Sequence, residues 1–145
     1  MSTSSPSELR RLWVALQRQP WTTLVVVPAH PGDSGLSAAR AILDAGAPYP
    51  EAGPLHLVDA TAVEEDSAAG LVREMKARTS EGRAVVALGS PLTQPAGLRV
   101  AYAADAALLS VTLGDTDLAS ARRTVELVGH ERFLGSVTLP PEKKK

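Results

Sequence analysis

The chain has 145 residues, a net charge of −1 and no cysteine, which excludes thiol catalysis, Cys-ligated zinc and a disulfide framework. Its length is that of one domain, able to bury a core without help from a metal. Three of the fifteen basic residues are Lys143, Lys144 and Lys145, without which the net charge would be −4, and only 3% of the residues are aromatic, so no nucleic-acid surface is expected.

The first residues, MSTSSPSELRR, lack the apolar segment of a secretory signal, and no apolar stretch approaches the roughly eighteen residues of a membrane span. We therefore expect a cytoplasmic protein that does not insert directly into a membrane. Residues 1–6 are expected to be disordered, 7–139 to form a single domain, and 140–145 to form a basic tail. That tail is either a solvated end or a weak contact for anionic lipid.

A helix is predicted before the first strand. Ser7 can cap it, and it ends before Pro20. Its apolar residues recur at i, i+3, i+4 and i+7 and form one stripe: Leu9, Leu12, Trp13 and Leu16. This stripe either packs on the domain or offers Trp13 to a partner protein.

The segment 21–46, WTTLVVVPAHPGDSGLSAARAILDAG, combines an apolar run, a Pro/Gly turn and a helical pattern. Residues 24–27 show no alternation, as expected of a strand covered on both faces in a parallel sheet. Asp33 or Ser34 can cap the helix, and Gly46 can end it. This is the outline of a strand, phosphate loop and helix, in which glycines let backbone N–H groups close on a phosphate.

Four further apolar runs predict strands at residues 55–58, 84–88, 106–111 and 133–139. A capping-box pattern from Thr61 to Glu64 predicts a helix reaching about residue 78, and a short helix is expected near 98–103. Asp115 or Thr116 can cap the last helix. Strands that alternate with helices require parallel pairing with right-handed crossovers, so we predict a three-layer α/β sandwich around a five-stranded parallel sheet.

In such sheets, ligands lie beyond the carboxyl ends of the strands. Five polar residues are expected at that edge: His30, Asp33, Asp59, Ser90 and Asp115. Asp59 is either a metal ligand or a turn residue, and we favour the turn. The histidines lack i, i+4 spacing, so no metal site is predicted.

Five segments stand out in chain order: PAHPGDSGLSAARAIL, LHLVDAT, VVALGSPL, AADAALLSVTLGDT and LVGHERFLGSVTL. Together they resemble the ATPase domain of the bacterial protein-tyrosine kinases that control exopolysaccharide synthesis. Those kinases are relatives of the septum-positioning and plasmid-partition ATPases. The similarity extends over residues 8–139 and is most specific in A-D-A-x-L-L-x-V and G-x-E-R-x-L-G-x-V. The resemblance implies a P-loop NTPase-like fold with strand order 2-3-1-4-5.

The catalytic positions of that family are changed. The family's phosphate loop, A-x-P-G-[DE]-G-K-S-T, corresponds here to a degenerate loop: His30, Pro31, Gly32, Asp33, Ser34, Gly35, Leu36 and Ser37. By this resemblance Gly35 replaces the lysine and Leu36 the magnesium-binding hydroxyl. Asp59 matches the retained second-strand aspartate, whereas Gly89 replaces the third-strand one.

Phosphoryl transfer depends on positioning and on positive charge around the γ-phosphate, so these losses remove the main catalytic groups. We expect a pseudo-ATPase with no catalytic residue, metal or cofactor that acts as a regulatory or scaffold protein. Its partner would be a membrane-associated subunit of a polysaccharide or cell-envelope machine, or a second copy in a homodimer. Four residues are candidate contacts: Trp13, His30, Asp33 and Leu36.

Three alternatives remain open at this point, the first being a subunit of a larger complex with no link to polysaccharide, since a fold does not fix a function. The chain could be an atypical ATP-binding ATPase or tyrosine kinase whose lysine is supplied by a partner. The loop could also retain weak anion binding, because a free helix N-terminus attracts negative charge without any lysine.

Overall fold

The computed structural model describes residues 6–49, 53–80, 82–114 and 117–140. Helices and strands alternate along the chain in this order: α1 Pro6–Leu16, β1 Thr23–Pro28, α2 Leu36–Gly46, β2 Leu55–Ala60, α3 Ala68–Arg78, β3 Arg83–Leu88, α4 Gly97–Ala103, β4 Ala106–Thr112, α5 Leu118–Val128, the 3-10 turn η2 His130–Arg132, and β5 Phe133–Leu139. Most of the expected disordered N-terminus and basic tail lies outside the described residues, but Pro6 is already helical.

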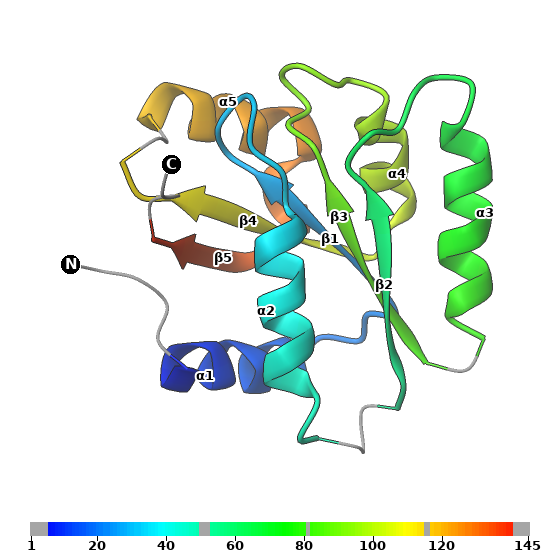
Figure 1. The fold of residues 1–145 in the computed structure, drawn as a ribbon, viewed down its shortest axis with the longest axis vertical. Coiled ribbons are helices and arrows are strands. Elements are labelled where there is room, and N and C mark those ends of the chain that lie inside the picture. Colours follow the sequence, from blue (N-terminus) through cyan, green and yellow to red (C-terminus); the bar gives the residue numbers. More distant parts are fainter. Residues whose placement is uncertain (1–5, 50–52, 81, 115–116, 141–145) are drawn as a thin grey trace, which may run out of the picture.

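The five strands form one parallel sheet in the order β2-β3-β1-β4-β5, as predicted (Figure 1). Strand β1 is central, and Val25 lies opposite Val86 of β3 and Ala107 of β4. Every residue of β1 is buried. The unbroken apolar run in β1 thus has the burial that its lack of alternation predicts.

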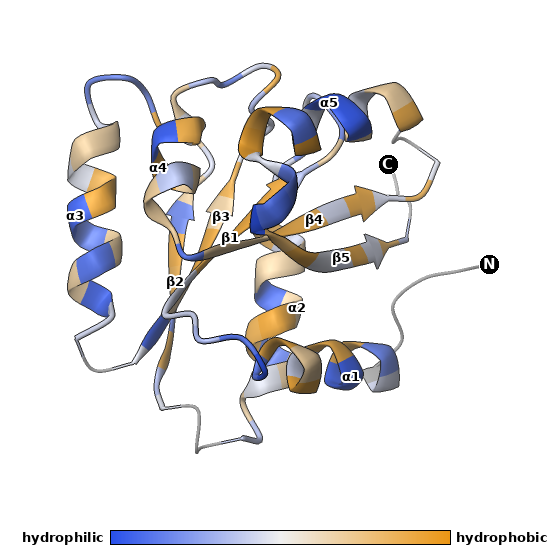
Figure 2. Cartoon of the chain, turned by 180° about the vertical axis from the view of Figure 1, so that it is seen from behind, coloured by the Kyte–Doolittle hydropathy of each residue, from blue (hydrophilic) through white to orange (hydrophobic). Residues whose placement is uncertain are grey.

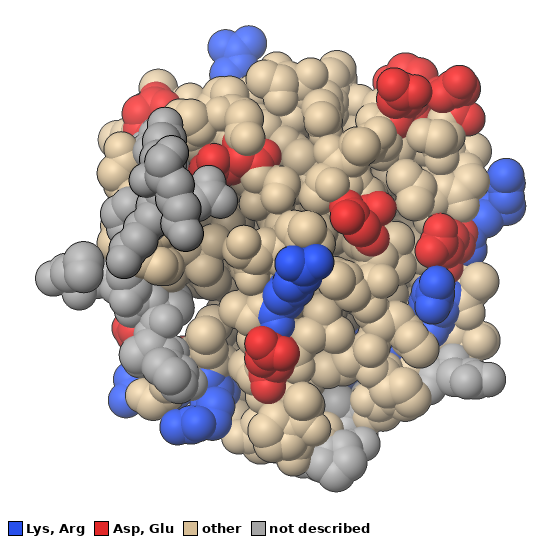
Figure 3. Space-filling view, viewed as in Figure 1, with Lys and Arg blue, Asp and Glu red and all other residues tan. Residues whose placement is uncertain are grey.

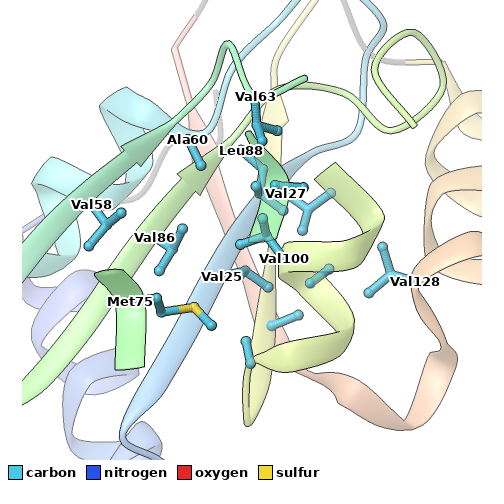
Figure 4. Packing of buried hydrophobic residues seen from close by; sticks show 14 of the residues in the cluster. Val25, Val27, Val58, Ala60, Val63, Met75, Val86, Leu88, Val100 and Val128 are labelled. Carbon is cyan, nitrogen blue, oxygen red and sulfur yellow. The ribbon is translucent and has the colours of Figure 1, made fainter. Parts of the chain in front are cut away.

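Helices α1 and α2 cover one face of the sheet and α3, α4 and α5 cover the other, which confirms the three layers (Figures 1 and 2). Successive side chains of a strand point to opposite faces. Leu24 and Val26 therefore belong to the core under α1 and α2. Val25 and Val27 belong to the core under the other three helices, where Figure 4 shows them close to Val100.

The predicted partner contact at Trp13 is wrong, because this side chain is only 1% exposed. Its ring meets Trp21 edge to face, with the ring centroids 6.3 Å apart and an interplanar angle of 88°. A Cβ atom at Gly46 would lie 2.7 Å from the Trp13 ring, so α1 and α2 approach closely here. The apolar stripe of α1 is part of the core because the helix packs on the α2 face of the sheet.

Two predicted helix starts are also corrected. Helix α3 begins at Ala68 rather than at Thr61, because both the N–H and the hydroxyl of Thr61 donate to Asp59 and hold Thr61 in a turn after β2. Helix α5 is capped by Asp117, whose carboxylate accepts from the Ser120 N–H at 3.0 Å. The predicted caps Asp115 and Thr116 lie outside the described residues.

Candidate functional site

Residues 29–35 form the loop between β1 and α2, hereafter the 29–35 loop, at the carboxyl edge of the sheet. The Ala29 N–H donates to the Ser110 carbonyl oxygen at 2.9 Å, which ties the start of the loop to β4. A turn follows, in which the Asp33 N–H donates to the His30 carbonyl oxygen at 3.1 Å and Gly32 has φ +91°. This positive φ explains a glycine at position 32.

Gly35 is held directly against the sheet. Its N–H donates to the Leu88 carbonyl oxygen at 2.7 Å, so the loop is bonded to the end of β3. A Cβ atom at position 35 would lie 2.2 Å from the Val26 carbonyl oxygen. No side chain fits there unless the backbone moves, so the position that resembles the family's lysine cannot carry a lysine in this loop conformation.

Several N–H groups of the loop and of the start of α2 donate to other groups of the protein. Besides those of Asp33 and Gly35, the Leu36 N–H donates to the Ser34 hydroxyl at 3.3 Å. The N-cap residue of α2 is Gly35, one position after the predicted cap Ser34 and two after the predicted cap Asp33. Three of the four N–H groups of residues 33–36, a region whose N–H groups face the ligand in a phosphate-binding loop, therefore have partners within this chain.

The side chains of the loop and of the start of α2 differ in their exposure. His30, Asp33 and Leu36 are half-buried, and Leu36 packs against the core under α1 and α2. Ser34 and Ser37 are exposed. Of the loop contacts predicted for a partner, Leu36 thus presents only part of its side chain to the surface.

At the end of β3, a glutamine occupies the space beside Gly89. A Cβ atom on Gly89 would lie 2.2 Å from Gln94 Oε1 and 3.0 Å from the Thr61 carbonyl oxygen. Gln94 Oε1 is buried and has no hydrogen-bond partner among the described residues. The position that resembles the family's third-strand aspartate therefore has no room for a carboxylate while Gln94 keeps this conformation.

Asp59 lies at the end of β2 and serves the turn that follows. One carboxylate oxygen accepts from the Thr61 hydroxyl at 2.6 Å and from the Thr61 N–H at 3.0 Å. These two hydrogen bonds hold the pKa of Asp59 below its usual value. The geometry supports the turn reading, and the described residues contain no group of three acidic or histidine side chains that could hold a metal ion.

A hollow of about 370 Å³ opens between the 29–35 loop and the ends of β4 and β5. Seven of the described residues line it: Gly32, Asp33, Ser34, Ser37, Thr112, Leu139 and Pro140. Asp33 is the one ionisable side chain among them, and its carboxylate disfavours a phosphate. Of the edge residues predicted from the sequence, only Asp33 lines the hollow; Asp59 and Ser90 lie elsewhere on the edge, and Asp115 is outside the described residues.

Sequence reasoning missed Gln94 and the packing role of Gly35. The glutamine lies in a loop, GSPLTQPAG, whose composition indicates only a turn. The contacts of Gly35 join it to Val26 and Leu88, which lie on two different strands. Neither hydrophobic periodicity nor a sequence motif indicates a contact between a loop residue and two separate strands.

None of the described helices is long and apolar enough to cross a membrane. A scan of the chain against protein-family models finds no match, and a search of curated proteins finds none either.

Proposed function

We propose that this protein is a non-catalytic, degenerate relative of the P-loop ATPases and acts as a regulatory or scaffold protein through protein contacts. The hydrogen bond from the Gly35 N–H to Leu88 carries the proposal, together with the lack of room for a side chain at position 35. A loop bonded to its own sheet has fewer donors left for a phosphate.

The charges around the hollow support the same conclusion. No cation lines it within the described residues, and the sole lysine before residue 143 is Lys76. Lys76 lies on α3, on the face of the sheet opposite α2. Catalysis of phosphoryl transfer would need positive charge beside the γ-phosphate, and none of the described residues that line the hollow supplies it.

The resemblance to the exopolysaccharide kinases suggests the setting of this role, a polysaccharide or cell-envelope machine. The partner would be a membrane-associated subunit of such a machine or a second copy of the chain. Near the loop, a partner would meet the exposed Ser34 and Ser37 and the exposed parts of His30 and Asp33.

Thermal unfolding in the presence of millimolar Mg-ATP tests the proposal. We expect no change in the midpoint of thermal unfolding. In a separate phosphate assay, we expect no release of phosphate above a buffer blank. A ligand at a hundred times its dissociation constant would add about 2.7 kcal/mol of stability, which would raise the midpoint measurably.

Magnesium-dependent release of phosphate that Asp59→Ala abolishes would overturn the proposal. It would establish the alternative, an atypical ATP-binding enzyme. The matched control is Asp66→Ala, which removes an exposed carboxylate further along the same loop between β2 and α3. A rise in the unfolding midpoint without hydrolysis would show that the loop retains nucleotide binding alone.

A further inference from the structure

Helix α1 carries two adjacent exposed arginines and one exposed acidic residue, Glu8 in its first turn, so its outward side is net basic. Arg10 and Arg11 are exposed on the side opposite the apolar stripe, and Arg18 is exposed in the turn that follows the helix. Between the arginines lies Val14, which is 54% exposed. A shallow hollow of about 380 Å³ beside Val14 is lined by Ser7, the two helical arginines, Val14 and Tyr49. We call Arg10, Arg11 and Val14 the basic face of α1.

The loop between β2 and α3 carries the opposite charge. Glu64, Glu65 and Asp66 are consecutive and exposed. Neither these carboxylates nor the arginines of the basic face form an ion pair with another residue of the described ranges. We call residues 64–66 the acidic turn.

The basic face and the acidic turn lie at opposite corners of the molecule. Both ribbon views place α1 at the lower corner on one side and the loop before α3 at the upper corner on the other (Figures 1 and 2). Figure 3 shows acidic side chains gathered over the region of that loop and basic ones over the region of α1. The two charges therefore cannot neutralise each other within one chain.

We propose that two copies of this protein associate head to tail, with the acidic turn of one copy on the basic face of the next. This inference rests on the proposed contact role and names the partner as a second copy. Arginine donates to carboxylates through a planar fork, which gives such a contact direction as well as charge. Val14 supplies the one large exposed apolar side chain at the centre of the basic face.

The geometry has two consequences. Because the two surfaces differ, each pair leaves one basic face and one acidic turn free, so association continues into a ring or an open chain. The contact involves one short helix and one turn, so it belongs among small, transient interfaces. Its strength should fall steeply with salt, because exposed charges are screened over about 10 Å at 0.1 M ionic strength.

Sedimentation velocity of the concentrated protein at about 25 mM and about 500 mM salt tests this inference. We expect species larger than the monomer at low salt and the monomer at high salt. The double variants Arg10→Gln/Arg11→Gln and Glu64→Gln/Glu65→Gln should each weaken association by about tenfold. The matched control, Arg122→Gln/Arg123→Gln, removes two adjacent exposed arginines from α5 and should leave association unchanged.

A mixture of the two double variants provides the sharper result. Each variant keeps one intact surface, so the mixture should form a heterodimer and nothing larger. A monomer at low salt, or wild-type association in either double variant, would overturn the inference, even if the protein also fails to hydrolyse ATP. Monomers that bind phosphatidylserine vesicles through Arg10 and Arg11 would overturn it too and assign the basic face to a membrane surface.

Discussion

In the 29–35 loop, three backbone N–H groups donate to carbonyl oxygens of the protein, including that of Leu88, whereas α1 turns Arg10 and Arg11 outward and buries Trp13. Both regions contain residues that were predicted from the sequence to contact a partner protein. The fold leaves different kinds of groups accessible in the two regions. A backbone N–H bonded to a neighbouring strand is lost to ligands, while a charged side chain on an outer helix face stays accessible. If the proposed contact role is correct, recognition is therefore expected to use the side chains of α1 more than the loop.

Trp13→Ala should have the largest effect, because it empties part of the core on the inner side of α1. Replacing a buried tryptophan by alanine costs about 3–5 kcal/mol. Trp13 Nε1 is buried without a hydrogen-bond partner among the described residues, which places the expected loss near the lower end, about 3 kcal/mol. Urea unfolding measures it.

Val14→Ala is the control on the outer side of the same helix, where we expect a change within about 0.5 kcal/mol. Equal losses in the two variants would mean that α1 is not seated as described. That result would remove the contrast between its inner and outer faces.

Gly35→Ala should have the next largest effect, because its Cβ atom meets the carbonyl oxygen of Val26 and the backbone has to move. Overpacking of this kind costs about 1–3 kcal/mol. The measurement is again urea unfolding, and Gly35→Lys should be destabilised likewise and gain no affinity for Mg-ATP.

Gly70→Ala provides a control of opposite sign. Gly70 lies in the exposed part of α3, where an added Cβ atom meets only the end of the Arg73 side chain, at 3.9 Å. Helix propensity then predicts that the free energy of unfolding rises by about 0.5–1 kcal/mol. A neutral Gly35→Ala would show that the loop can leave the sheet, and it would restore the possibility of a ligand-binding loop.

Asp105→Asn should cause a smaller, pH-dependent loss of stability, because Asp105 holds the connection between α1 and β1. Asp105 Oδ2 accepts from the Thr22 N–H at 2.8 Å, the Thr22 hydroxyl at 2.9 Å and the Thr23 N–H at 3.3 Å. Partial burial raises the pKa of Asp105, but these hydrogen bonds outweigh it and hold the pKa below its usual value.

A depressed pKa contributes stability above the unfolded pKa, near 4, and this contribution is lost as the pH falls through the lower, folded pKa. The site is largely exposed, so we expect a loss of about 1 kcal/mol at pH 7 in Asp105→Asn that vanishes at strongly acidic pH. Unfolding free energies measured at several pH values test this. A loss that is the same at all pH values would assign Asp105 a packing role.

Local sequence patterns were sufficient to predict much of the fold. Residues 24–27 predicted a strand buried on both faces, and the repeated alternation of strand and helix predicted a parallel sheet with three layers. These predictions succeed because hydrophobic periodicity is a property of neighbouring residues. A strand buried on both faces can be recognised from its own sequence, as an apolar run without alternation. The strand order came from the family resemblance and agrees with the structure.

The sequence by itself determined which residues are apolar, which are charged and where the chain must turn, and that positions 35 and 89 carry glycine rather than a lysine or a carboxylate. Only the tertiary structure decided that Trp13 faces the core, that Gly35 lies against Val26 and Leu88, and that Gln94 fills the space beside Gly89. The reason is physical: each of these outcomes depends on the approach of groups from another helix, strand or loop, and on the space that remains when they pack.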